Sequence, residues 1–279
     1  MIQISPRSIA ALVCVAAGVS ACVPDPGRSE RADTEYLRIV AAEDARPAGG
    51  PELEILVEGT NHDLAFIRHA SVRALGRLER PELLEHIAPL LHDPSPQVRQ
   101  SAVNATAQAF HTSQDAGTVA ALLLDRVDGE DDPAVRGTLA RSMGRLSVDR
   151  PTRRRFAETL VEMSRVGDAD AHQETILGVA MGLESLVRRD ADEGVSPAVA
   201  ERLDELAVYP TIMAGDPDPA RIRALALTAL RNSRRITAQR ILSALRDHEP
   251  QPATVATRSM DAAPPGQQDE ILRRAIGHP

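Results

Sequence analysis

The sequence predicts an all-α protein, an alpha-alpha superhelix in which about six helical hairpins stack side by side. Aromatic residues make up only 2% of the 279 residues and tryptophan is absent, whereas good helix formers such as alanine, leucine and arginine dominate. A pattern of an acidic turn followed by an aliphatic residue and an arginine recurs along the chain. After each such turn, apolar residues keep the spacing of one helix face.

Residues 1–21 have the layout of a signal peptide. A single positive charge at Arg7 precedes an apolar run over 9–19, which is shorter than the roughly 20 residues of a membrane-spanning helix. The segment ends in small residues before Cys22, and 19–22 resembles the lipobox of bacterial lipoproteins. This resemblance implies that Cys22 becomes the lipid-carrying N-terminus. The alternatives are an ordinary signal peptide with cleavage elsewhere and an apolar N-terminal helix.

The lipobox resemblance implies a protein of the cell envelope, held on a membrane by its acyl chains and exposed to the periplasm or the outer surface. The other cysteine, Cys14, lies in the segment expected to be removed, so no disulfide is expected. Proline, glycine and charge without apolar periodicity predict a flexible tether over 22–34. The helical array is then expected over 35–279.

The repeat is marked by an arginine near the start of one helix in each hairpin. The four marker arginines are Arg68, Arg99, Arg136 and Arg223. The aspartates of the preceding turns are Asp63, Asp93, Asp132 and Asp218. Weaker copies are expected around 170–186 and near Pro252.

A second set of amphipathic segments lies between the marked helices. Their apolar faces are Leu83, Ile87, Leu90 and Leu91; Phe156, Leu160 and Met163; Val199, Leu203 and Leu206; and Ile241, Leu242 and Leu245. The unit is therefore a helical hairpin, and because one hairpin cannot bury its apolar face alone, neighbours are expected to stack. Prolines at the proposed helix starts support these boundaries.

This arrangement resembles HEAT repeats, especially their short bacterial variants, over most of the chain. The resemblance implies that the turn aspartates and marker arginines form a ladder of ion pairs that links adjacent units. Regularly repeated charges favour this structural role over ligand binding.

Catalytic and metal-binding motifs are not found. The eight histidines include no HExxH motif and no pair one helical turn apart, which favours surface histidines over a metal site. Serine nucleophile motifs and phosphate-binding glycine loops are also absent, and glycines such as Gly76, Gly144 and Gly182 are explained by close helix packing. The residues of this chain are thus expected to form no enzyme and to need no cofactor.

The stretches over 42–47 and 71–105 resemble HEAT-repeat lipoproteins of the cyclophilin-type peptidyl-prolyl isomerase class. The stretch from Glu270 to Pro279 matches the end of the first helix of a hairpin and the turn after it, which suggests that the array continues beyond this chain. The resemblance implies an isomerase domain after residue 279, because no cyclophilin motif lies within the sequence.

The leading interpretation is a scaffold that binds a protein or an extended peptide on the concave face of the array. The alternative is the substrate-presenting region of a prolyl isomerase. The formal charge of −8 disfavours nucleic acid as a partner, because phosphate binding needs a cationic surface.

Overall fold

A computed structural model describes residues 26–110, 116–165, 173–189, 194–211, 217–260 and the single positions Gln268, Ile271, Arg273 and Arg274. The expected signal peptide and Cys22 lie outside these residues. Within them the chain forms helices and no strand, which confirms the predicted fold class.

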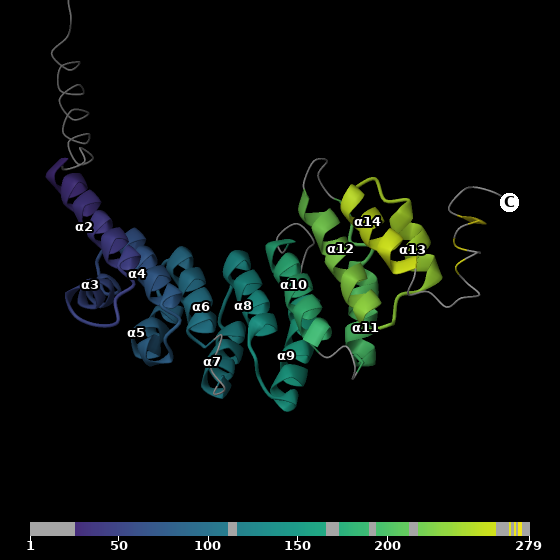
Figure 1. The fold of residues 1–279 in the computed structure, drawn as a ribbon, viewed down its shortest axis with the longest axis horizontal. Helices are drawn as coiled ribbons and strands as arrows, with labels where there is room; N and C mark the ends of the chain where they lie inside the picture. The colour runs from purple at the N-terminus through teal and green to yellow at the C-terminus, as the bar shows by residue number, and fades with distance from the viewer. Residues whose placement is uncertain are drawn as a thin grey trace, which may run out of the picture.

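The helices form an arch of two rows (Figure 1). The inner row, on the hollowed side, contains α2 (Pro26–Asp44), α4 (Ala65–Arg77), α6 (Pro96–Ala109), α8 (Pro133–Arg145), α10 (Gln173–Arg189), α12 (Pro217–Asn232) and α14 (Pro250–Ser259). The outer row contains α3 (Pro51–Gly59), η1 (Pro81–Leu83), α5 (Leu84–Ile87), η2 (Ala88–His92), α7 (Gly117–Asp128), α9 (Arg150–Met163), α11 (Pro197–Leu206) and α13 (Ala238–Leu245). Each outer element pairs with the inner helix that follows it, so the six predicted hairpins are present.

The N-terminal helix α2 begins earlier than the sequence suggested. Residues 26–34, part of the expected tether, are helical and continue into the segment that packs on α3 and α4. Ile39 is fully buried and Ala42 nearly so, so the second half of α2 covers the apolar end of the array. The packing of α2 on α3 and α4 stabilises the helix, and it therefore extends into 26–34, where the local composition alone indicates a tether.

The helices begin at prolines and at side chains that cap their N-termini. Proline occupies the first or second position of α3, α6, α8, α9, α11 and α14, where its missing amide hydrogen costs little. Side chains of Asp132, Asp149, Ser196 and Thr237 accept hydrogen bonds from the first free N–H groups of their helices.

The core lies between the two rows. Phe156, Leu160, Leu203 and Ile241 of the outer row are fully buried, as their helical spacing predicted. The outer segment over 81–92 differs, because it is split into two 3-10 turns and one short α-helix. Pro89 cannot continue an α-helix, yet Leu83, Ile87, Leu90 and Leu91 all reach the core.

Glycines bring the inner helices close together. A Cβ on Gly178 of α10 would lie 2.1 Å from the carbonyl oxygen of Gly137 of α8, and one on Gly144 would lie 2.5 Å from the Cα of Gly182. Gly76 of α4 faces Ala105 of α6 in the same way, at 2.6 Å. The close packing predicted for Gly76, Gly144 and Gly182 is confirmed. Because the outer helices contact one another much less, the stack curves toward the inner row.

Candidate functional site: ion-pair ladder and inner surface

The predicted marker Arg68 forms a bond between two repeats. Its guanidinium donates to both carboxylate oxygens of Asp93, at 2.6 and 2.9 Å, and Asp93 belongs to the turn before α6. Its remaining nitrogen donates to the backbone carbonyls of His62 and Asp63 in its own turn, at 2.8 and 2.9 Å. Arg68 therefore fixes its own turn and attaches the next one.

Arg99 makes the same arrangement one repeat later, but with Glu130, a carboxylate outside the predicted set of turn aspartates. It donates to both oxygens of Glu130 at 2.8 Å and to the backbone carbonyl of Asp93 at 3.0 Å. Arg126 of α7 adds a bond to Glu130 at 2.7 Å and one to the carbonyl of Leu91 at 2.8 Å. The Glu130 side chain is completely buried between these two cations.

The other predicted residues have different roles. Arg223 of α12 holds Asp247, at 2.6 and 2.8 Å, in the turn before α14. Arg136 donates to the carbonyls of Val127 and Glu130, and Asp132 caps α8. Asp218 lies in the first turn of α12, and Asp63 contributes its backbone carbonyl to Arg68. The structure thus brings Arg68 and Asp93 together and gives Arg99 and Arg223 partners outside the predicted set.

A sequence signal for the missed partners exists. Asp93, Glu130 and Asp247 each lie three residues before the proline that begins the next inner helix. Each also accepts a backbone hydrogen bond from the residue two positions later. The spacing from carboxylate to helix proline, and not the nearest aspartate, therefore identifies the partner of the preceding arginine.

These contacts set the charge state of the buried acids. Burial raises the pKa of Glu130, but hydrogen bonds from Arg99 and the N–H of Asp132, with the charge of Arg126, outweigh it and hold that pKa below its ordinary value. Burial of Asp93 is opposed in the same way by Arg68, and the pKa of Asp93 is also lowered. Both side chains are therefore ionised in the folded protein at neutral pH.

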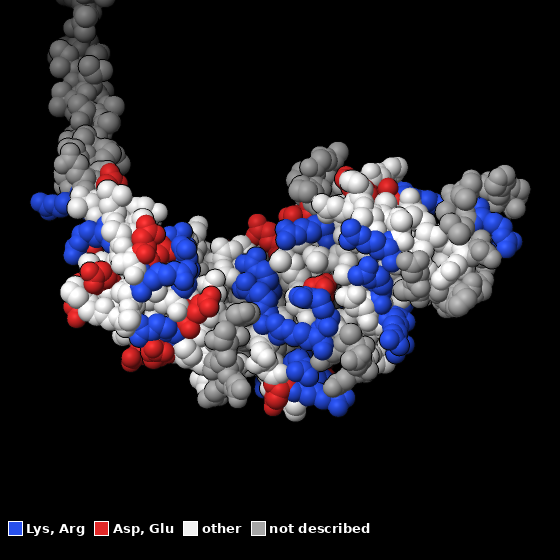
Figure 2. Space-filling view, viewed as in Figure 1, with Lys and Arg blue, Asp and Glu red and all other residues white. Residues whose placement is uncertain are grey.

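The exposed side of the inner row carries polar side chains that reach from helix to helix. Arg73 and Arg77 of α4 bind Glu43 of α2, at 2.8 and 2.5 Å. Gln100 of α6 donates to Thr138 of α8 at 3.2 Å. We call this face of α4, α6, α8, α10 and α12 the inner surface. In Figure 2 the upper edge of the arch is hollowed, and basic side chains gather over the middle of the molecule.

Arg141 and Arg145 of α8 are the exceptional cations of this surface. Both donate to the same amide oxygen, Oδ1 of Asn104, at 3.4 and 3.1 Å. No carboxylate of the described residues lies within ion-pair distance of either, and the Nε of each is buried without a partner. Burial lowers the pKa of both, and the charges of Arg221 and Arg141, respectively, lower it further.

A small cavity of about 180 Å³ opens beside Arg141. Its lining comes entirely from the inner helices α6, α8 and α10 and includes Gln100, Leu177 and Met181. It therefore lies on the inner surface and not between the two rows. Its walls combine the cation of Arg141, the carboxylate of Glu174, the amide of Gln100 and apolar side chains.

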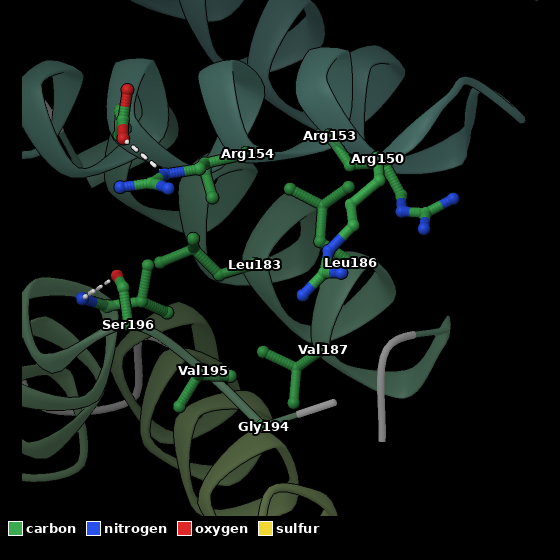
Figure 3. A pocket seen from close by; sticks show the side chains of 12 residues that line it. Arg150, Arg153, Arg154, Leu183, Leu186, Val187, Gly194, Val195 and Ser196 are labelled. Atoms are coloured by element: carbon green, nitrogen blue, oxygen red, sulfur yellow. Dashed lines mark hydrogen bonds and ion pairs between the residues drawn. The ribbon is translucent and has the colours of Figure 1, made fainter. Parts of the chain in front are cut away.

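A larger cavity of about 410 Å³ lies between α9, α10 and α11 (Figure 3). Among the described residues, apolar side chains line one side of this cavity: Leu183 and Leu186 of α10, and Val195 just before α11. The arginines of α9 line the opposite side. Arg154 is paired with Glu158 at 3.1 Å. The chain segment before Gly194 lies outside the described residues.

The described residues contain no group of His, Cys, Asp or Glu side chains placed to hold a metal ion. His62 instead accepts a hydrogen bond from the N–H of Leu64 through its Nδ1, at 3.0 Å. None of the described helices combines the length and the apolar character needed to cross a bilayer.

This arrangement defines an alpha solenoid: stacked helical hairpins, linked by arginine–carboxylate pairs between repeats. Residues 53–144, which run from α3 to the end of α8, match the sequence model of HEAT repeats. No curated protein matches the chain as a sequence relative.

Solved structures show the same fold. A HEAT-like repeat protein from the archaeon Thermococcus onnurineus NA1 is 15% identical, with 86% of this chain and 97% of that chain covered and a TM-score of 0.55. An engineered protein is 16% identical, with 76% and 96% covered and a TM-score of 0.50. A designed armadillo repeat protein is 13% identical, with 75% and 99% covered and a TM-score of 0.48. The likeness to the archaeal protein shows that the fold is a HEAT-like solenoid.

Proposed function

We propose that this chain is a membrane-anchored scaffold that holds a partner protein, or an extended peptide from one, along its inner surface. The observation that carries the proposal is the continuity of that surface. Successive inner helices present amides, arginines and apolar side chains on one face, with a cavity at α6, α8 and α10. Solenoids bury their core between repeats and leave such a face free for binding.

Site-specific photo-crosslinking in the native envelope tests the binding face. A photoreactive residue replaces Met181 of the inner surface, and a matched one replaces Thr159 of the outer helix α9. We expect the same discrete protein adduct from repeated experiments at position 181 and none at 159. Adducts at 159 alone, or none at either position, would contradict the proposal.

The membrane anchor is proposed from the lipobox-like residues that end at Cys22. A diacylated cysteine followed by a short segment would hold the N-terminal end of the array at a bilayer surface. Cells grown with a labelled fatty acid provide the measurement. The wild-type chain should carry label and Cys22→Ala should not, whereas equal labelling of the two excludes this anchor.

A second candidate function is the presentation of substrate to a peptidyl-prolyl isomerase domain located after residue 279. The motivation is the family resemblance over 71–105, which covers the second half of α4, the outer elements η1, α5 and η2, and most of α6. In that case the inner surface holds an unfolded chain near the isomerase. The coding sequence beyond codon 279 decides: a stop codon there removes this candidate, and a cyclophilin-like sequence supports it.

A further inference from the structure

The described arginines that lie deepest in the protein follow a consistent rule. Arg68, Arg99 and Arg223 have side chains 14%, 15% and 9% exposed, and each donates two hydrogen bonds to one carboxylate. Arg126, 10% exposed, shares Glu130 with Arg99. Such pairing offsets the cost of removing a charge from water.

Arg141 and Arg145 break this rule. They are only partly accessible and lie one turn apart on α8. Both donate to a neutral acceptor, Asn104 Oδ1, and Arg145 also donates to the neutral Ser142 Oγ at 3.4 Å. Arg221 of α12 adds a third positive charge, and its guanidinium donates to the sulfur of Met181 at 3.8 Å. Three cations therefore converge on the centre of the inner surface of a chain whose net charge is −8.

This arrangement is unfavourable for folding alone. Like charges on one helix at positions i and i+4 repel one another, and a neutral side chain would avoid that repulsion. Burial of a cation without an opposite charge adds a further cost. The Arg141–Arg145 pair lowers the stability of the fold and lies on the inner surface. Binding of a ligand of opposite charge therefore explains the pair better than a role in folding.

We infer that Arg141, Arg145 and Arg221 form the recognition site for an acidic, extended segment of the partner protein, with one carboxylate bridging Arg141 and Arg145. This inference rests on the proposed function and specifies the chemistry of the partner. Because both guanidiniums already reach one oxygen atom, the two oxygens of a carboxylate can replace Asn104 as their acceptor.

The geometry also suits a second acidic residue. Arg221 lies on α12, beyond α10 from the Arg141–Arg145 pair, so it extends the positive surface across the helix row. An extended peptide advances about 3.3 Å per residue and so can span neighbouring helices, which pack about 8–10 Å apart, within a few residues. Leu177 and Met181 of α10, which line the cavity at α6, α8 and α10, offer apolar contact to the residues in between.

The test is binding of a fluorescein-labelled oligo-glutamate peptide to the full chain in non-ionic detergent, followed by fluorescence anisotropy. The variant is Arg141→Gln with Arg145→Gln. The control is Arg31→Gln with Arg258→Gln, which changes the net charge equally at exposed positions near the two ends of the array. Oligo-glutamine and single-stranded DNA serve as competing probes.

We expect the wild type and the control to bind oligo-glutamate and the Arg141→Gln, Arg145→Gln variant to bind about tenfold more weakly or worse. The variant should be at least as resistant to urea as the wild type, since a structural role for the arginines would instead make it less stable. Equal binding by variant and wild type, tighter binding of DNA than of oligo-glutamate, or loss of stability overturns the inference.

The two proposals fail in different ways. If oligo-glutamate does not bind but position 181 still crosslinks to a partner, the scaffold function stands and the acidic chemistry is wrong. If position 181 also gives no adduct, the scaffold function itself is wrong.

Discussion

Glu130 is the most heavily coordinated side chain of the ladder. It accepts from Arg99, Arg126 and the backbone N–H of Asp132, and none of its side chain is exposed. Glu130 therefore links Arg99 of α6 with the outer helix α7 of the next repeat and with the turn before α8. Its removal leaves two nearly buried cations without an opposite charge.

Replacement of Glu130 by glutamine should destabilise the protein by about 3 kcal/mol or more, because Arg99 and Arg126 lose their counter-charge in a dry environment. Urea unfolding followed by circular dichroism measures this loss. The control is Glu158→Gln, whose partner Arg154 is 79% exposed and which should cost about 0.5 kcal/mol or less. Equal effects of the two substitutions would show that the ladder contributes little.

The buried acids also predict the pH dependence of stability. The fold holds the pKa of Glu130 below its ordinary value of 4.5, and those of Asp93 and Asp247 below their ordinary value of 3.8. The contribution of these carboxylates to the free energy of unfolding is therefore complete at pH values above those ordinary pKa values. This stabilising contribution is lost as the pH falls from the ordinary pKa values toward the lower pKa values of the folded state. Urea unfolding should give a constant contribution from these groups between neutrality and about pH 5 and a decline below it. Glu130→Gln should show a shallower decline, and an unchanged acid slope in that variant would contradict the assignment.

At the scale of the element, the sequence was sufficient to locate most of the amphipathic helices but not the ion-pair partners that link them. Apolar spacing identified Phe156, Leu160 and Met163 on α9 and the marker residues on α4, α6, α8 and α12, because a buried helix face is a local pattern. It did not single out α3 and α7. The ladder partner Glu130 was also missed, because it depends on which turn of the next repeat approaches Arg99.

Glycine positions are a second feature that only the packing explains. In an isolated helix Gly→Ala stabilises by about 1 kcal/mol. At Gly178 the added methyl group would meet the backbone of Gly137 instead, so Gly178→Ala should destabilise by about 1–3 kcal/mol. Thermal unfolding measures the effect, with Gly49→Ala as the control because a Cβ there meets no atom within 4 Å. A stabilised Gly178→Ala variant would mean that α8 and α10 are farther apart.

At the scale of the whole molecule, stability is expected to be distributed along the array. Each hairpin contacts mainly its neighbours, so a local defect should spread only to adjacent repeats. Hydrogen exchange of the Gly178→Ala variant should therefore quicken in α8, α10 and α12 and leave α4 near its wild-type rate. Uniform acceleration from α4 to α14 would indicate one cooperative unit.

The contact between α8 and α10 through Gly137, Gly144, Gly178 and Gly182 also has a mechanical consequence. Backbones that already touch cannot be compressed, so any bending of the arch has to be absorbed on its convex side, where side chains fill the larger spaces and can change rotamer. On the hollowed side of the arch, the spacing between α8 and α10 is therefore fixed. Arg141 and Arg145 of α8 are held at a fixed distance from α10, and an acidic segment of the kind proposed above would be selected by the spacing of its charges.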